Sequence, residues 1–171
     1  MRKLRYSVAA SLDGFIAGPN GEYDWIVQDP SFDFAALWAQ FDTLLMGRRT
    51  FQVAITRFPN LQAMGKKVVV VSSTLKHYPG VTIISDSVPH AVCALKSEPG
   101  KDVWLMGGGA LFRSLLDAGL VDTVELSVIP VLLGSGVPVL PEGAIARLHL
   151  YESSVLPSGI LRAAYSILPP A

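Results

Sequence analysis

Three consecutive glycines, Gly107–Gly109, form the segment of this sequence best suited to seat a phosphate. They follow the apolar run Val103–Met106, which predicts a buried parallel strand because polar and apolar residues do not alternate in it. The spacing of Leu111, Phe112 and Leu115 predicts a helix directly after the glycines. Strand, glycine turn and helix in this order place free backbone N–H groups and the positive end of a helix at the carboxyl edge of a sheet. A tight turn with no ligand would need the same glycines, so this segment alone leaves both interpretations open.

Two further segments carry phosphate-binding groups, and each also follows a predicted strand. Arg48–Thr50 follow the run Thr43–Met46, and Ser72–Ser73 follow the Val-rich run Lys67–Val71. Because the carboxyl ends of strands in an open α/β sheet share one edge, we expect all three segments to meet over one crevice. Guanidinium groups grip phosphate as a fork and hydroxyls donate one bond each, so the combination predicts a ligand with several phosphates. Taken singly, the arginines are equally typical of solvated surface charges and the serines of turns.

Other nucleotide and metal signatures are missing from the sequence. Gly107 comes late in the chain and no acidic ribose partner follows it, so the glycines are not the G-x-G-x-x-G dinucleotide motif, and no Gly-Lys-Ser/Thr loop occurs. The three histidines, His77, His90 and His149, have no ligand spacing, and we predict no metal site. The only cysteine, Cys93, excludes an internal disulfide and is typical of a protein of the reducing cytoplasm. We predict that its thiol is buried.

The elements that must position these segments can be predicted from the apolar runs. Five parallel strands are expected, over Leu4–Ala10, Thr43–Met46, Lys67–Val71, Val81–Ser85 and Val103–Met106. Helices are expected over residues 31–40 with Ser31 as the N-cap, over Ser87–Ser97, and from the glycines to about Ala118.

The pattern changes after Asp122, where three more strands are expected without helices between the last two. Leu148–Val155 and Ile160–Leu168 are separated only by the turn Leu156–Gly159, so they must pair antiparallel. The fold class predicted is therefore α/β, with a mostly parallel sheet and an antiparallel C-terminal edge. No linker or repeat divides the chain, so residues 1–171 are expected to form a single domain.

Composition limits the partners. Half of the residues are hydrophobic and only 16% are charged, which predicts that a second subunit covers part of the surface in a homodimer. A formal net charge of zero argues against nucleic acid and anionic membranes as partners. No apolar run approaches the roughly 18 residues of a membrane span, and the basic N-terminus does not lead into a signal peptide. We therefore expect a cytoplasmic protein that binds a small molecule.

Four motifs in order support a family resemblance over nearly the whole chain. They are Ala9–Ala17 with its Ser-Leu-Asp-Gly, Met46–Phe51 with its Gly-Arg-Arg-Thr, Val69–Ser73, and Trp104–Gly109. In this order and spacing the chain resembles the dihydrofolate reductase superfamily. It is most similar to the branch that holds the C-terminal reductase domain of the bifunctional riboflavin-biosynthesis deaminase-reductase. The resemblance implies an eight-stranded mixed sheet with helices on both faces, and a reductase that uses NADPH.

The resemblance also implies roles for individual residues. Arg48, Ser72 and Ser73 would face the adenosine 2′-phosphate of NADPH, which should favour it over NADH. Arg49 and Thr50 would face the pyrophosphate together with the N–H groups after Gly107, Gly108 and Gly109, the first two of which are joined by a cis peptide in this superfamily. Ala10 and Ile16 would border the nicotinamide. Gly47 and Leu111 complete the cofactor-binding set.

Departures from the superfamily pattern bear on the substrate. Asp33 lies near the place of the carboxylate that helps to protonate the pterin, and Asp13 belongs to the riboflavin-type pattern near nicotinamide and substrate, although a turn-forming Asp-Gly is an equal alternative. Lys66 and Lys67 stand where an arginine clamps folate, and they cannot form its bidentate fork. Ala110 replaces a basic residue.

These features predict a stand-alone reductase. It would transfer hydride from NADPH to a pterin- or pyrimidine-like molecule, with Asp13 and Asp33 handling protons. The nearest known activity is that of 5-amino-6-(5-phosphoribosylamino)uracil reductase in riboflavin biosynthesis. The zinc-dependent deaminase half is missing, since one cysteine cannot build its metal site. Dihydrofolate reduction and a non-catalytic NADPH-binding module are the alternatives.

Overall fold

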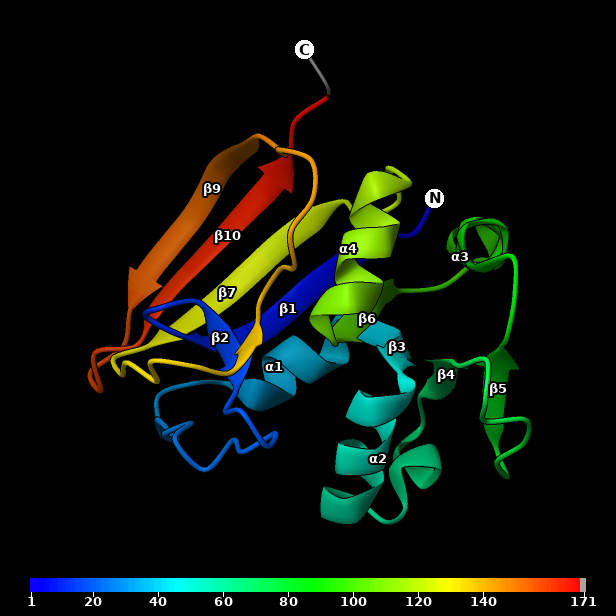
Figure 1. Cartoon of the computed structure of the whole chain (residues 1–171), viewed down its shortest axis with the longest axis horizontal. Helices are drawn as coiled ribbons and strands as arrows, with labels where there is room; N and C mark the ends of the chain where they lie inside the picture. Colours follow the sequence, from blue (N-terminus) through cyan, green and yellow to red (C-terminus); the bar gives the residue numbers. More distant parts are fainter. Residues whose placement is uncertain (170–171) are drawn as a thin grey trace.

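A computed structural model describes residues 1–169, and its centre is an eight-stranded twisted sheet (Figure 1). The strands of this sheet are β1 (Leu4–Ser11), β3 (Phe41–Gly47), β4 (Lys67–Val71), β5 (Val81–Ile84), β6 (Asp102–Gly107), β7 (Thr123–Ile129), β9 (Leu148–Val155) and β10 (Leu161–Ile167). Their spatial order is β5-β4-β3-β6-β1-β7-β10-β9, and neighbours from β5 to β7 are parallel while β10 is antiparallel to both β7 and β9. The predicted mostly parallel sheet with an antiparallel C-terminal edge is confirmed. A small second sheet pairs β2 (Phe15–Ala17) with β8 (Val137–Pro138).

Helices cover both faces of the large sheet, as the resemblance implied. They are α1 (Phe34–Ala39), α2 (Arg48–Arg57), the 3₁₀ turn η1 (Leu61–Met64), α3 (Val88–Ser97) and α4 (Gly109–Asp117). Residues of α3 and α4 share one apolar core with β1 and β6, whereas α1 and α2 pack into a second core with β3 and β4. None of the helices in residues 1–169 is long and apolar enough to cross a membrane.

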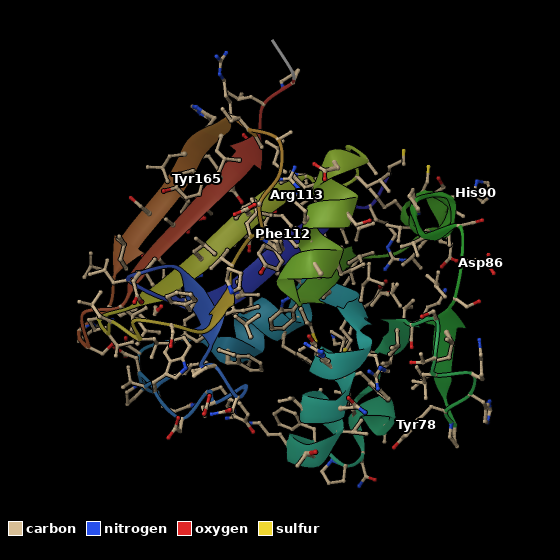
Figure 2. The ribbon with its side chains drawn as sticks, in the orientation of Figure 1. Tyr78, Asp86, His90, Phe112, Arg113 and Tyr165 are labelled. Carbon is tan, nitrogen blue, oxygen red and sulfur yellow. The ribbon has the colours of Figure 1, made fainter. Side chains whose placement is uncertain are left out.

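The alternation of β1 separates an apolar face of the sheet from a polar one. Leu4 and Tyr6 are fully buried in the core beneath α4, where the ring of Tyr6 stacks on Phe112 at a centroid distance of 3.8 Å. Figure 2 labels Phe112 on α4. Arg5 and Ser7 point to the opposite face, where they line a cleft beside α1. Successive strand residues face opposite ways, so the odd-numbered residues of β1 are the ones that can meet a ligand on the α1 side.

Two sequence predictions about the helices were wrong. The first helix begins at Phe34 with Asp33 as its N-cap, because the Asp33 carboxylate accepts the Ala36 N–H at 2.8 Å; Ser31 instead bonds to Asp29. Cys93 is exposed. The buried stripe of α3 runs through Val92, Leu95 and Lys96, which places the residue after Val92 on the solvent side.

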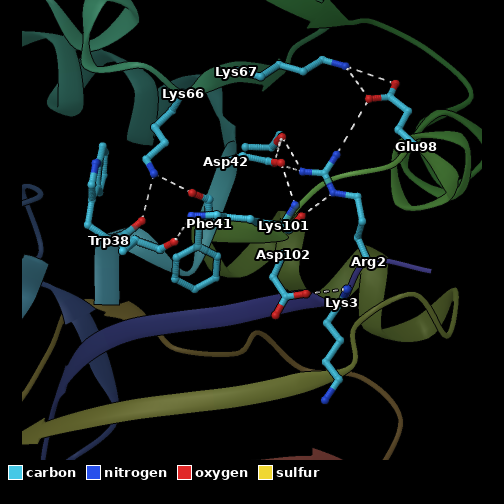
Figure 3. Close-up of polar contacts among 12 residues, drawn as sticks. Arg2, Lys3, Trp38, Phe41, Asp42, Lys66, Lys67, Glu98, Lys101 and Asp102 are labelled. Carbon is cyan, nitrogen blue, oxygen red and sulfur yellow. Dashed lines mark hydrogen bonds and ion pairs between the residues drawn. The ribbon is translucent and has the colours of Figure 1, made fainter. Parts of the chain in front are cut away.

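A polar network joins the amino ends of β1, β3 and β6 (Figure 3). Arg2, only 7% exposed, donates to Asp42 and to the Thr43 hydroxyl, the latter at 2.7 Å. Asp42 also accepts the backbone N–H of Lys101 at 2.7 Å. The buried guanidinium is therefore paired, as a charge in that position requires.

Tyr6→Phe is expected to lower the free energy of unfolding by about 1 kcal/mol near neutral pH, the usual net value of one hydrogen bond. The phenol of Tyr6 donates to the Val139 carbonyl at 3.1 Å, and burial raises its pKa well above the usual value. Above about pH 10 this tyrosine ionises in the unfolded chain but not in the native one, so the stability that Tyr6 contributes is lost there in the wild type, and the variant has no such contribution to lose. Urea unfolding at neutral and alkaline pH should show the gap narrowing; a gap that stays constant with pH would contradict the assignment.

Candidate active site

The three segments predicted to bind phosphate begin side by side at the carboxyl edge of the sheet. β4, β3 and β6 are consecutive strands, and the register pairs Gly47 with Val71 and Met46 with Gly107. The residues that follow these strands therefore start from one edge, and their meeting over a single crevice stays a prediction, because Ser72 and Ser73 do not line the cleft described below.

Two helix N-termini meet at this edge. α2 begins at Arg48 after Gly47, and α4 begins at Gly109 after Gly108; neither N-cap position offers a side-chain hydrogen bond. A Cβ built on Gly47 would lie 3.9 Å from the backbone nitrogen of Gly108, so the two helix starts are in contact distance of each other. Each start leaves backbone N–H groups without intrahelical partners and adds the positive end of a helix dipole. Groups of this kind can bind an anion.

The glycine turn itself has the conformation that the resemblance implied. The Gly107–Gly108 peptide is cis, and Gly107 has φ of +120°, which L side chains rarely adopt. The Thr50 hydroxyl faces both glycines, since it lies 3.7 Å from a Cβ built on either one. Thr50 can therefore donate to a group that rests on the turn.

A cleft of about 770 Å³ opens over this turn, and we call it the glycine-turn cleft. Four of the predicted cofactor residues line the end of this cleft at the glycine turn: Arg49, Thr50, Gly108 and Gly109. A fifth, Ile16, lines the apolar wall with Ala17 and Val137. Its size and its mix of apolar walls with a few polar groups are typical of a small-molecule site.

Several lining residues were not predicted from the sequence. They include Ser7, Ala9, Trp104 and Val137, and Tyr23 lines the cleft from a loop. Ala9 could have been found, because strand alternation places it on the same face as Ser7, whereas the predicted Ala10 is only 2% exposed on the other face. Ala10 can reach a ligand through its backbone alone. No strand or helix period predicts the loop residue Tyr23.

The remaining predicted cofactor residues lie around the cleft rather than in its lining. Arg48 is exposed and forms no ion pair with any residue in the described range 1–169. The Ser72 oxygen accepts the Leu75 N–H at 2.9 Å and shares a longer hydrogen bond, of 3.4 Å, with the Thr74 hydroxyl. Ser73 is exposed, and Leu111 is buried in the core under α4, so Leu111 can offer only its backbone.

A second cleft, of about 330 Å³, adjoins the first at Ser7, and we call it the α1 cleft. Asp33 lines it, together with Ser127 and Arg162. Arg5, also in the lining, is held by Glu125 at 2.7 and 2.9 Å. Desolvation acts to lower the pKa of Arg5, but the hydrogen bonds and charges of Glu125 and then of Asp102 together outweigh it and leave this pKa raised. Arg5 is therefore a permanent, already paired cation.

Asp13 does not line either cleft. Its carboxylate accepts the backbone N–H groups of Leu133 and Gly134, the latter at 2.7 Å. A hydrogen bond from the Ser11 side chain, followed by those amides, lowers the pKa of Asp13. The geometry favours an anchor for the loop after β7, and the predicted proton-handling role of Asp13 stays a prediction.

The lysines in the place of the folate clamp are already engaged (Figure 3). Lys66 donates to the carbonyl of Trp38 in α1 and to that of Phe41 at the start of β3, and Lys67 pairs with Glu98 at 2.9 Å. Both stand at the amino end of β4, opposite the edge that holds the glycine turn.

This strand order, with a cis glycine pair opening α4, defines a dihydrofolate reductase-like fold. A sequence model of the RibD C-terminal domain matches residues 2–161, and the chain belongs to that family.

The chain is also similar to individual proteins in sequence and in structure. YyaP, an uncharacterized protein of Bacillus subtilis (strain 168), is 34% identical over 177 residues, covering 96% of this chain and 94% of that protein. A putative riboflavin biosynthesis protein from Shewanella sp. PV-4 has a crystal structure that superposes with a TM-score of 0.84 at 26% identity, covering 99% of this chain and all of the other. Dihydrofolate reductase from Enterococcus faecalis, complexed with NADP(H) and RAB-propyl, gives a TM-score of 0.70 at 18% identity over 96% of each chain. The last likeness concerns the fold alone.

Proposed function

We propose that this protein is an NADPH-dependent reductase of a pterin- or pyrimidine-like small molecule, most like the 5-amino-6-(5-phosphoribosylamino)uracil reductase of riboflavin biosynthesis. The observation that carries the proposal is the pair of adjoining N-termini of α2 and α4 at the glycine-turn cleft. Arg48 and Arg49 lie in the first turn of α2. Such a donor set fits a ligand with a pyrophosphate and a further phosphate. The bound NADP(H) of the structurally similar Enterococcus faecalis reductase is consistent with it.

Each part of the cleft has a task in this proposal. The N–H groups of α2 and α4 and the Thr50 hydroxyl bind the pyrophosphate, while Arg48 with Ser72 binds the 2′-phosphate. The apolar wall at Ala9 and Ile16 orients the nicotinamide ring, and the α1 cleft beside it holds the substrate. NADPH, when bound, supplies the hydride. Asp33 is the proposed group that holds a proton for the substrate, because it is the predicted carboxylate that lines the substrate cleft.

The test is a titration of NADPH fluorescence followed by a screen for NADPH oxidation. Pterins, dihydrofolate and ribosylaminouracil 5′-phosphate are the substrates to be screened. We expect saturable NADPH binding, oxidation with a pterin- or pyrimidine-like compound, and weak binding of methotrexate because Lys66 and Lys67 are engaged elsewhere. Binding without oxidation of any compound would favour the non-catalytic module, tight methotrexate binding would favour dihydrofolate reduction, and no binding of NADPH would refute the proposal.

The homodimer expected from composition stays a prediction, and the C-terminal hairpin offers the surface it needs. All eight residues of β9 are exposed. Leu150 and Val155 pair across the ladder with Tyr165 and Leu161, so these apolar side chains share one sheet face. Figure 1 shows no helix of residues 1–169 across β9 and β10 on the side toward the viewer, and Figure 2 labels Tyr165 on β10 there.

A further inference from the structure

Arg162 on β10 is a cation without an anionic partner inside the α1 cleft. Its guanidinium carbon lies 4.9 Å from the ring centroid of Phe32, and no carboxylate within residues 1–169 is at ion-pair distance from it. The other guanidinium of the cleft, Arg5, is by contrast already taken by Glu125. A guanidinium carries five N–H donors, and a phenyl face accepts none of them as an ordinary hydrogen bond. Arg162 is therefore free to bind an anion.

A row of cross-strand neighbours connects Arg162 to the glycine-turn cleft. Ala9 pairs with Ser127, Ser127 pairs with Arg162, and Arg162 pairs with Ser154. Paired residues point to the same face of a sheet, so the two serines flank the arginine on the side of the α1 cleft, which both of them line. Neighbouring strands lie about 4.8 Å apart, which puts Arg162 about 10 Å from Ala9 at the wall of the other cleft.

The segment under Arg162 is tied to the hairpin that carries it. The Asp29 carboxylate accepts the Ser31 N–H at 2.8 Å and, from the turn between β9 and β10, the Ser158 N–H at 2.9 Å. Hydrogen bonds from the Ser158 and Ser31 side chains, and then from their amides, lower the pKa of Asp29, so this tether stays ionised near neutral pH. Phe32 follows Ser31 directly, so its ring is positioned under the guanidinium before any ligand arrives.

We propose that Arg162, flanked by Ser127 and Ser154, is the residue that binds the carboxylate or phosphate of the substrate, about 10 Å from the cleft wall at Ala9. This proposal depends on the reductase function proposed above for its statement that the ligand is the substrate. The acidic groups of the cleft leave Arg162 available. Glu125 is paired with Arg5, and neither Asp33 nor Glu152 is within ion-pair distance of Arg162. A neutral substrate would leave the guanidinium unpaired in a half-buried cleft.

The test uses the full chain without NADPH and follows the Nε–H NMR signal of Arg162, assigned by its loss in Arg162→Gln. Benzoate and phenyl phosphate are the anionic probes, and benzamide is the neutral probe of the same shape as benzoate. We expect saturable shifts of the signal with at least one anion and none with benzamide. Affinities measured by calorimetry should fall roughly ten- to hundredfold in Arg162→Gln and less in Arg162→Lys, which keeps the charge but loses the fork.

The relative affinities of the two anions separate the two sources of charge, since tighter phenyl phosphate indicates a phosphorylated substrate and tighter benzoate a carboxylated one. Arg147→Gln removes an equal charge from the loop before β9 and should leave both affinities unchanged. Benzamide binding equal to that of benzoate, or anion affinities unchanged in Arg162→Gln, would overturn the proposal. Because no NADPH is present, a failure here is distinct from a failure of NADPH to bind or to be oxidised.

Discussion

Arg48→Ala is expected to raise the dissociation constant of NADPH about ten- to hundredfold while leaving that of NADH unchanged. The guanidinium of Arg48 is exposed at the first residue of α2 and forms no ion pair with any described residue, so it is free for the 2′-phosphate that only NADPH carries. A hydrogen bond to a charged group contributes about 1.5–3 kcal/mol, which corresponds to this range. Fluorescence titrations with both nucleotides give the two constants.

Loss of folding is a poor alternative explanation for such a result. A positive charge at a helix N-terminus opposes the helix dipole, so removing Arg48 should leave the free energy of unfolding unchanged or slightly higher. Arg147→Ala provides a control with the same loss of charge far from α2. Equal weakening of NADPH and NADH in Arg48→Ala would show that the arginine does not face the 2′-phosphate.

The sheet could be predicted from the sequence because its strands are local patterns. Val-rich Lys67–Val71 and the uninterrupted Val103–Met106 mark central parallel strands, and the short turn Leu156–Gly159 forces the antiparallel hairpin. The meeting of the glycine turn with Arg48–Thr50 followed from the same reasoning, because strand ends share an edge.

The features that could not be predicted depend on contacts distant in sequence. Asp13 carries the motif of a site residue, yet its carboxylate is bonded to Leu133 and Gly134, more than a hundred residues away. Arg162 has no motif at all, and only the register between β7, β10 and β9 sets it between two serines. Cys93 was misplaced for a smaller reason, since a one-residue error in the phase of a helix stripe moves a side chain from core to solvent.

Gly108→Ala is expected to lower the affinity for NADPH and Gly109→Ala to lower the stability of the fold, although the two glycines are neighbours. Gly108 has φ of −86°, an ordinary value for any residue, and a Cβ added to it would have its nearest contact at 3.7 Å. Alanine therefore fits the folded chain there. The new methyl group would occupy the position proposed for the bound pyrophosphate. We expect NADPH affinity to fall at least tenfold, by the loss of one or more charged hydrogen bonds, with the free energy of unfolding changed by less than about 1 kcal/mol.

Gly109→Ala should instead destabilise the fold. Its Cβ would lie 2.7 Å from the Pro138 carbonyl oxygen, so the segment after β8 has to move. That segment is held by the Val139 N–H on the Gly14 carbonyl at 2.9 Å and by the Tyr6 hydroxyl on Val139, and displacing it strains both bonds. Overpacking of this kind costs about 1–3 kcal/mol, or a fall of roughly 3–10 °C in Tm for a chain of this size. Thermal unfolding and NADPH titration of both variants separate the two effects. If Gly108→Ala bound NADPH like the wild type, the phosphate seat would have to lie elsewhere, and if Gly109→Ala kept the wild-type Tm, the segment after β8 would have to be free to move.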